Sequence, residues 1–165
     1  MLTVIKKVHK IIIKHETVDV WFNPFTNNYS LHSSTVFMDE ETIVDFYAGT
    51  IQSFPTYLTI QTAADTHITL KPDFLQYVNH SCEPNVFFDT LAMQLVCIKP
   101  VQPGDELRFF YPSTEWEMAK PFHCNCGAEN CLKIITGAAD LIQEIHSKYR
   151  LTNFIWQQLK QKIQL

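Results

Sequence analysis

The chain has 165 residues, of which 46% are hydrophobic and 18% charged, a composition that suits one globular domain with a full core. Its 13 basic and 17 acidic residues give a formal net charge of −4, which argues against direct nucleic-acid binding and suits a basic peptide as partner. The apolar runs are too short to span a bilayer, and the first residues lack the apolar core of a signal peptide. We therefore expect no membrane association and an intracellular location, cytoplasmic or nuclear.

Short runs of β-branched and aromatic residues, separated by turn residues, occupy the first half of the chain. They lie at residues 2–13, 17–22, 35–38, 42–47, 57–61 and 67–70. Residues 23–28, with the sequence NPFTNN, are typical of a turn. The pattern predicts short strands with frequent turns, and so a mainly β, β-rich α+β fold.

The second half continues this pattern and then changes character. Residues 86–88 and 91–98 predict a hairpin, and a turn at 100–105 leads into a strand over 106–111. From residue 138 onward the chain has no Gly or Pro, and its apolar residues recur at nearly helical spacing. We expect two helical segments there, broken near Thr152 and Asn153, packed on the domain of a monomer.

A polar block at residues 79–85, NHSCEPN, interrupts an apolar run and has the character of a site. Three cysteines, Cys124, Cys126 and Cys131, lie within eight residues further along, and Gly127 lets the backbone turn between them. In a reducing compartment such spacing favours metal over disulfides. Zinc takes four soft ligands in a tetrahedron, so a fourth must come from elsewhere.

Three residues are candidates for this fourth ligand. Cys82 lies in the polar block and is favoured. Cys97 lies in the middle of an apolar strand, where a buried, inert thiol is the better interpretation. His123 remains possible, although its neighbour Cys124 already occupies that part of the site.

Three motifs, in order, resemble the last two core motifs and the post-SET segment of SET-domain protein lysine methyltransferases. They are NHSCEPN at 79–85, GDELRFFY at 104–111, and CNCG at 124–127 followed by Cys131. The resemblance covers about residues 37–137 and is strongest after Gln76. It implies a SET-domain fold of short twisted sheets with a knot-like C-terminal segment, a post-SET zinc loop and C-terminal helices.

The resemblance also implies an activity: transfer of a methyl group from S-adenosylmethionine to a lysine of a histone tail or another protein. By position, Asn79 and the His80 backbone would hold the cofactor. Tyr111 would contact the cofactor and place its hydroxyl near the methyl group, and Tyr47 would line the lysine channel. Phe109 stands at the family's phenylalanine or tyrosine switch, which implies di- or trimethylation. The family also carries its fourth zinc thiolate at the position of Cys82.

The chain departs from the family pattern at several positions. The usual Gly-x-Gly turn before the first motifs is absent, and Asn28, in Asn28-Tyr29-Ser30, is the nearest substitute because asparagine tolerates left-handed conformations. Phe110 replaces the usual aspartate before the tyrosine, and Lys133 replaces a glycine after the last cysteine.

We expect residues 1–112 to form the SET domain with a variable insert at about 50–74, residues 113–137 the post-SET zinc segment, and 138–165 the helical tail. The main alternative is a catalytically inactive SET module that binds peptides or a partner through the same groove. A structural zinc protein of another fold is a third possibility.

Overall fold

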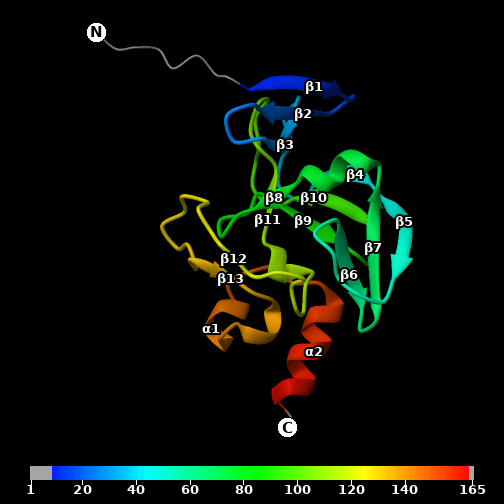
Figure 1. The fold of residues 1–165 in the computed structure, drawn as a ribbon, viewed down its shortest axis with the longest axis vertical. Helices are drawn as coiled ribbons and strands as arrows, with labels where there is room; N and C mark the ends of the chain where they lie inside the picture. The colour runs from blue at the N-terminus through cyan, green and yellow to red at the C-terminus, as the bar shows by residue number, and fades with distance from the viewer. Residues whose placement is uncertain (1–8, 164–165) are drawn as a thin grey trace.

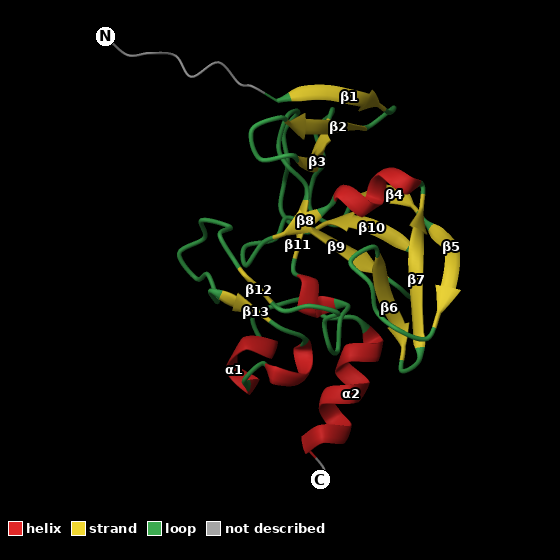
Figure 2. Cartoon of the chain, viewed as in Figure 1, coloured by secondary structure: helices red, strands yellow, loops and turns green. Residues whose placement is uncertain are grey.

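The computed structural model describes residues 9–163 as five small β-sheets with short helices toward the C-terminal end (Figure 1; Figure 2). The strands are β1 (Lys10–Lys14), β2 (Val18–Asn23), β3 (Asn28–Ser33), β4 (Thr42–Asp45), β5 (Tyr47–Gln52), β6 (Thr59–Ala63), β7 (Thr66–Lys71), β8 (Asn79–His80), β9 (Val86–Asp89), β10 (Gln94–Cys97), β11 (Arg108–Phe109), β12 (Phe122–His123) and β13 (Ile134–Ile135). The helices are the 3₁₀ turns η1 (Asp73–Tyr77), η2 (Tyr111–Ser113) and η3 (Ala138–Asp140) and the α-helices α1 (Gln143–His146) and α2 (Asn153–Ile163). The predicted mainly β architecture is confirmed. None of the described helices has the length and apolar character needed to cross a membrane.

The N-terminal sheet is an antiparallel meander of β1, β2 and β3. Of the strand predicted over 2–13, residues 2–8 lie outside the described part of the chain, and its end forms β1. The sequence analysis missed β3, which has no β-branched residue. This strand forms because Leu31 pairs with Val20 on β2 and its carbonyl accepts a hydrogen bond from the backbone N–H of Leu107, 2.8 Å away.

The turn between β2 and β3 depends on its asparagines. The side chain of Asn23 accepts a hydrogen bond from the backbone N–H of Phe25 at 3.0 Å. Asn27 has a left-handed backbone with φ 55°. The expectation that Asn28 takes this role was wrong by one residue, because Asn28 already pairs with Asn23 as the first residue of β3.

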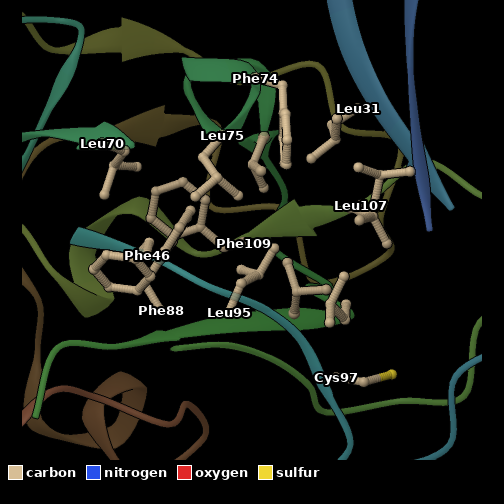
Figure 3. Packing of buried hydrophobic residues seen from close by; sticks show 14 of the residues in the cluster. Leu31, Phe46, Leu70, Phe74, Leu75, Phe88, Leu95, Cys97, Leu107 and Phe109 are labelled. Carbon is tan, nitrogen blue, oxygen red and sulfur yellow. The ribbon is translucent and has the colours of Figure 1, made fainter. Parts of the chain in front are cut away.

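Two three-stranded antiparallel sheets, ordered β4-β10-β9 and β5-β7-β6, surround the main hydrophobic core. The predicted strands at 57–61 and 67–70 correspond to β6 and β7, and the predicted hairpin to β9 and β10. Rings and aliphatic side chains from several elements meet in this core (Figure 3). Phe88, which is fully buried, packs edge-on against Phe109 with ring centroids 4.8 Å apart. The core thereby holds the end of β11.

Two segments distant in sequence pair in parallel at the centre of the molecule, where β8 lies beside β11 (Figure 1). Asn79 is opposite Arg108 in this pairing. Beyond the strands, the backbone N–H of Ser81 donates to the Phe109 carbonyl at 3.0 Å, and that of Asn85 to the Arg108 carbonyl at 3.0 Å. The strand predicted over 106–111 is therefore only two residues long, but it connects the two motifs directly.

Two helical segments were predicted for the C-terminal tail, residues 138–165, and only the second of them forms a long helix. Helix α2 begins at Asn153, where the break was expected, and buries Phe154, Ile155 and Leu159. The segment before it forms only η3 and the single-turn α1. Gly137 precedes η3 where the chain passes so close to Trp116 that a Cβ would lie 2.0 Å from its carbonyl oxygen. This close approach anchors the start of the tail on the preceding loop.

Candidate functional site

The four cysteines named as metal ligands form one cluster. Their Sγ atoms all lie within 4.8 Å of one another, and those of Cys82 and Cys124 are 3.9 Å apart. Zinc–sulfur bonds of about 2.3 Å in a tetrahedron place the sulfurs about 3.8 Å apart. The cluster of Cys82, Cys124, Cys126 and Cys131 therefore fits a structural zinc site.

The other two candidates for the fourth ligand lie outside this cluster. Cys97 is fully buried in the main core, and its thiol donates to the Lys99 carbonyl at 2.8 Å (Figure 3). His123 is exposed on β12. The geometry of the described residues therefore supports Cys82, rather than Cys97 or His123, as the fourth ligand.

The zinc loop between β12 and β13 makes two tight turns. Gly127 has φ 79°, a left-handed conformation that glycine adopts without cost. Lys133, which stands where the family resemblance predicts glycine, has φ 67°. Its carbonyl accepts a hydrogen bond from the backbone N–H of Cys124 at 2.8 Å, which closes the loop.

Burial opposes ionisation of the thiols in this cluster. It raises the pKa of Cys124 to about 11 and that of Cys82 further. Burial also acts against the ionised form of Cys126, but hydrogen bonds from backbone N–H groups and neighbouring thiols bring its pKa down to about 6. A cluster with one readily formed thiolate and three others nearby suits a divalent cation, which stabilises all of them as thiolates.

The C-terminal tail holds the zinc cluster against the core. The carbonyl oxygen of Cys82 accepts hydrogen bonds from the Tyr149 hydroxyl at 2.8 Å and from the Asn130 side chain at 3.1 Å. The ring of Tyr149 stacks on Phe110, with centroids 3.7 Å apart and planes 8° apart. Phe110, which replaces the aspartate expected from the resemblance, is 2% exposed. The substitution therefore supplies the ring on which the tail packs.

His80 connects the zinc cluster with the end of the second motif. Its Nδ1 accepts a hydrogen bond from the backbone N–H of Tyr111 at 3.2 Å, and its Nε2 lies 3.4 Å from the Sγ of Cys82. Burial lowers the pKa of His80 to about 4, so the imidazole is neutral at physiological pH. A neutral ring that accepts at Nδ1 carries its proton on Nε2, which faces the sulfur.

One open cavity, of about 420 Å³, lies between the NHSCEPN motif and the zinc loop. It is lined by Asn79, His80, Tyr111, Phe122, His123, Cys124, Asn125 and Cys126. Its volume lies in the range of small-molecule and cofactor sites. Both predicted cofactor-binding residues of the first motif face it together with Tyr111.

A second cavity, of about 400 Å³, also has Tyr111 in its lining and has mainly apolar and aromatic walls. Phe109 and Tyr111 line it, and their ring centroids are 4.7 Å apart. Burial raises the pKa of Tyr111 to about 12, so its hydroxyl stays protonated. Asn79, Tyr111 and Phe122 line both cavities. The two spaces therefore meet at Asn79 and Tyr111, which the motifs single out, and at Phe122.

Among the predicted catalytic and cofactor-binding residues, Tyr47 is the one that lines neither cavity. It lies on β5, opposite Lys71 of β7, and its side chain is 66% exposed.

Asn79 is held by groups from two other elements. Its side-chain amide donates to the Tyr29 carbonyl at 2.9 Å and to a carboxylate oxygen of Glu106 at 3.0 Å. The other Glu106 oxygen accepts from Arg108 at 2.5 Å. Strand β3, which follows the turn at Asn27, is thus tied to the NHSCEPN motif through Tyr29.

Sequence reasoning missed two residues of the site. Phe122 lies at the junction of the cavities and packs edge-on against His80 at 5.6 Å. Glu115 is a buried carboxylate in the wall of the cavity that contains Phe109. The signal for Glu115 was its position four residues after the motif tyrosine, but nothing local in the sequence indicates that it is buried.

A model of the SET domain family matches residues 3–112, which is more than half of the chain, so the protein belongs to the SET domain family. Its four-thiol cluster and short sheets agree with the fold and zinc segment that the resemblance implied.

Two curated relatives show the range of similarity. The chain is 46% identical over 98 residues to "Methyltransferase flvH" of Aspergillus flavus, an alignment that covers 58% of this chain and 54% of the relative. It is 30% identical over 105 residues to a "Histone-lysine N-methyltransferase, H3 lysine-36 specific" of Gibberella zeae, covering 60% of this chain and 10% of that protein. The chain thus spans about half the length of the first relative and a tenth of the second.

A solved structure gives the same fold. The crystal structure of KRYPTONITE in complex with mCHG DNA and SAH matches with a TM-score of 0.52 and 21% identity, covering 64% of this chain and 26% of that one.

Proposed function

We propose that this SET-domain chain is an S-adenosylmethionine-dependent protein-lysine N-methyltransferase. Its acceptor would be a lysine of a histone or another protein, which it would di- or trimethylate. The named methyltransferases among its relatives support the reaction class, and the relative specific for histone H3 supports a protein acceptor.

One observation carries the proposal: two cavities meet at Asn79, Tyr111 and Phe122. Direct methyl transfer needs the donor and the acceptor amine in line, and it needs little acid or base chemistry beyond deprotonation of the amine. Two cavities that share Tyr111 in their linings fit two reactants that meet at that residue.

Residues of the 420 Å³ cavity would hold the methyl donor, with Asn79 and the His80 backbone at its amino-acid end. S-adenosylmethionine, when bound, supplies the electrophilic methyl group. The hydroxyl of Tyr111, which stays protonated because burial raises its pKa to about 12, would donate a hydrogen bond that orients the reacting groups.

The apolar cavity would receive the substrate lysine. Its walls include Phe88, Phe109 and Tyr111, and burial of an ammonium among apolar groups lowers its pKa and favours the nucleophilic amine. The aromatic rings then stabilise the methylated cation by cation–π attraction. Phe109, which is 6% exposed and has no hydroxyl to hold a water molecule, leaves room for a second and third methyl group.

The test is incubation of the zinc-loaded protein with a peptide array and labelled S-adenosylmethionine, followed by mass spectrometry of the modified peptides. The proposal expects lysine methylation, and stabilisation of the fold by S-adenosylhomocysteine of about 2.7 kcal/mol at a hundredfold excess over its Kd. Absence of both effects would rule out the enzyme.

A second candidate is a SET module without activity that binds a partner through the same groove. The observation in its favour is that the Asn79 amide donates to the Tyr29 carbonyl and to Glu106, which already satisfy both of its N–H groups. Stabilisation of the fold by S-adenosylhomocysteine distinguishes the two candidates, because only the enzyme has to bind this ligand.

A further inference from the structure

Glu115 is a buried acidic side chain at the substrate side of the site. It is 7% exposed and lies just after η2, with its backbone N–H donating to the Tyr111 carbonyl at 3.1 Å. It lines the same cavity as Phe109 and Tyr111. A carboxylate in this wall is unexpected, because the other groups that line the cavity are mainly apolar or neutral.

The structure fixes one carboxylate oxygen and leaves the other open. Oε1 accepts hydrogen bonds from the backbone N–H of Gln61 at 3.0 Å and from the Thr114 hydroxyl at 2.9 Å. Among the residues that the structure describes, Oε2 has no hydrogen bond. Nδ1 of His67 lies 4.0 Å from Oε2 and is itself buried, without a hydrogen-bond partner among the described residues.

The groups around this carboxylate do not neutralise it. His67 on β7 is uncharged at neutral pH, because burial lowers its pKa, although Asp65 in the preceding turn acts in the opposite direction. Tyr111 is a neutral phenol, and Lys120 lines the same cavity without an ion pair to Glu115. Burial raises the pKa of Glu115 to about 7, despite its hydrogen bonds from Thr114 and Gln61.

We propose that Glu115 accepts the proton of the substrate ammonium in this cavity, and so generates the amine that takes the methyl group. This inference rests on the proposed lysine methyltransferase function. An N–H bond of the ammonium breaks, its electron pair stays on nitrogen, and the proton forms an O–H bond at Oε2. An ion pair thereby becomes two neutral groups, which an apolar cavity favours.

Methyl transfer restores a positive charge on the substrate nitrogen. The nitrogen then carries the positive charge that the sulfonium has lost, and Glu115 releases its proton to solvent as the cavity opens on product release. Each further methylation of the same lysine again begins with removal of one proton from the cation. His67, whose Nδ1 lies 4.0 Å from Oε2, adds no charge beside the carboxylate because burial lowers its pKa.

The test compares Glu115→Gln with wild type, using as acceptor the array peptide that the wild-type chain methylates fastest. Glutamine keeps the shape and the acceptor for Gln61 and Thr114 but cannot take a proton. At pH 7 we expect kcat to fall about a hundredfold, the size typical of general-base catalysis. The loss in kcat should shrink as the pH rises toward the pKa of the free lysine side chain. The Kd of S-adenosylhomocysteine should not change.

Glu117→Gln is the matched control, since Glu117 is exposed and lines neither cavity. It should leave kcat and its pH profile unchanged. A Glu115→Gln rate equal to wild type would overturn the inference. So would a loss that is constant across pH, because a purely structural or binding role predicts that. An inactive wild-type chain that binds no S-adenosylhomocysteine would instead overturn the proposed function, and the inference with it.

Discussion

The imidazole Nε2 of His80 lies 3.4 Å from the Sγ of Cys82, and the other ring nitrogen accepts a hydrogen bond from the backbone of Tyr111. One side chain thus contacts a zinc ligand and the tyrosine at the junction of the two cavities. The NHSCEPN motif therefore couples the metal site to the proposed methyl-donor site through a single ring. The sequence analysis assigned both jobs to this motif, and the structure adds the contact that joins them.

Replacement of Tyr111 by phenylalanine tests the role of its hydroxyl. We expect kcat to fall by about one to two orders of magnitude, because the reacting groups lose an orienting hydrogen bond. The S-adenosylhomocysteine Kd should stay within about twofold, since the ring and its contact with His80 remain. Normal methylation by Tyr111→Phe would remove the hydroxyl from the mechanism.

Replacement of Phe109 by tyrosine tests the methylation state. The added hydroxyl would hold water or occupy the space that a further methyl group needs, so the products should shift from di- and trimethyl-lysine toward monomethyl-lysine. Mass spectrometry of the products at matched total turnover measures this shift. An unchanged product distribution would show that Phe109 does not limit the number of methyl groups.

The stability of the chain should depend on the ionisation of Glu115. Its pKa is raised by burial from 4.5 to about 7, so the folded state binds more protons than the unfolded state between these values. The contribution of the Glu115 carboxyl to the free energy of unfolding is therefore fully present below about pH 4.5 and is lost as the pH rises to about 7. The difference in Tm between wild type and Glu115→Gln should therefore decrease as the pH rises across this window. The corresponding change in the free energy of unfolding is on the order of 3 kcal/mol. A difference independent of pH would show that the carboxyl titrates normally.

Restoring the family's aspartate at position 110 should destabilise this chain. Phe110 is buried and stacked on Tyr149, which holds the Cys82 carbonyl. Phe110→Asp removes this stack and buries a carboxylate without a partner, so we expect a loss of about 3 to 5 kcal/mol in thermal or denaturant unfolding. Tyr149→Phe is the control, because it keeps the stack and should cost only about 1 kcal/mol for the lost hydrogen bond. Equal stability of Phe110→Asp and wild type would contradict the packing role.

The sequence predicted the metal cluster and the motif junction because these depend on residue chemistry at short spacing. Four thiols within reach of each other satisfy a tetrahedral ion, and Cys82 was preferred over Cys97 since the latter lies in an apolar strand. The parallel pairing of β8 with β11, which brings the two motifs together, was not predicted from the sequence.

Features that depend on tertiary contact were not predictable in the same way. Strand β3 has weak strand propensity and forms because β2 and the segment before β11 bind its two edges. The first half of the tail has helical spacing but forms only η3 and one turn of α-helix, held at Gly137 by the close approach to Trp116. The burial of Glu115 has no local signal, because it comes from contacts with Gln61 and His67, about fifty residues earlier in the chain.

Cysteine 82 itself can be tested by substitution. Cys82→Ser should lose zinc, measured as metal content after purification, because three remaining thiols no longer complete the tetrahedron. Cys97→Ser should retain zinc even if it is less stable, since Cys97 lies outside the cluster. Full zinc content in Cys82→Ser would place the metal elsewhere.

The coupling of metal and donor sites is tested most directly by calorimetric titration of S-adenosylhomocysteine into the zinc-loaded protein and into the same protein after chelation. Circular dichroism of both samples verifies that the strands remain folded. Because the zinc loop forms one wall of the donor cavity and His80 contacts Cys82, we predict that chelation raises the Kd at least about tenfold, a typical coupling between linked sites. An equal Kd with and without zinc, in protein that remains folded, would contradict the account.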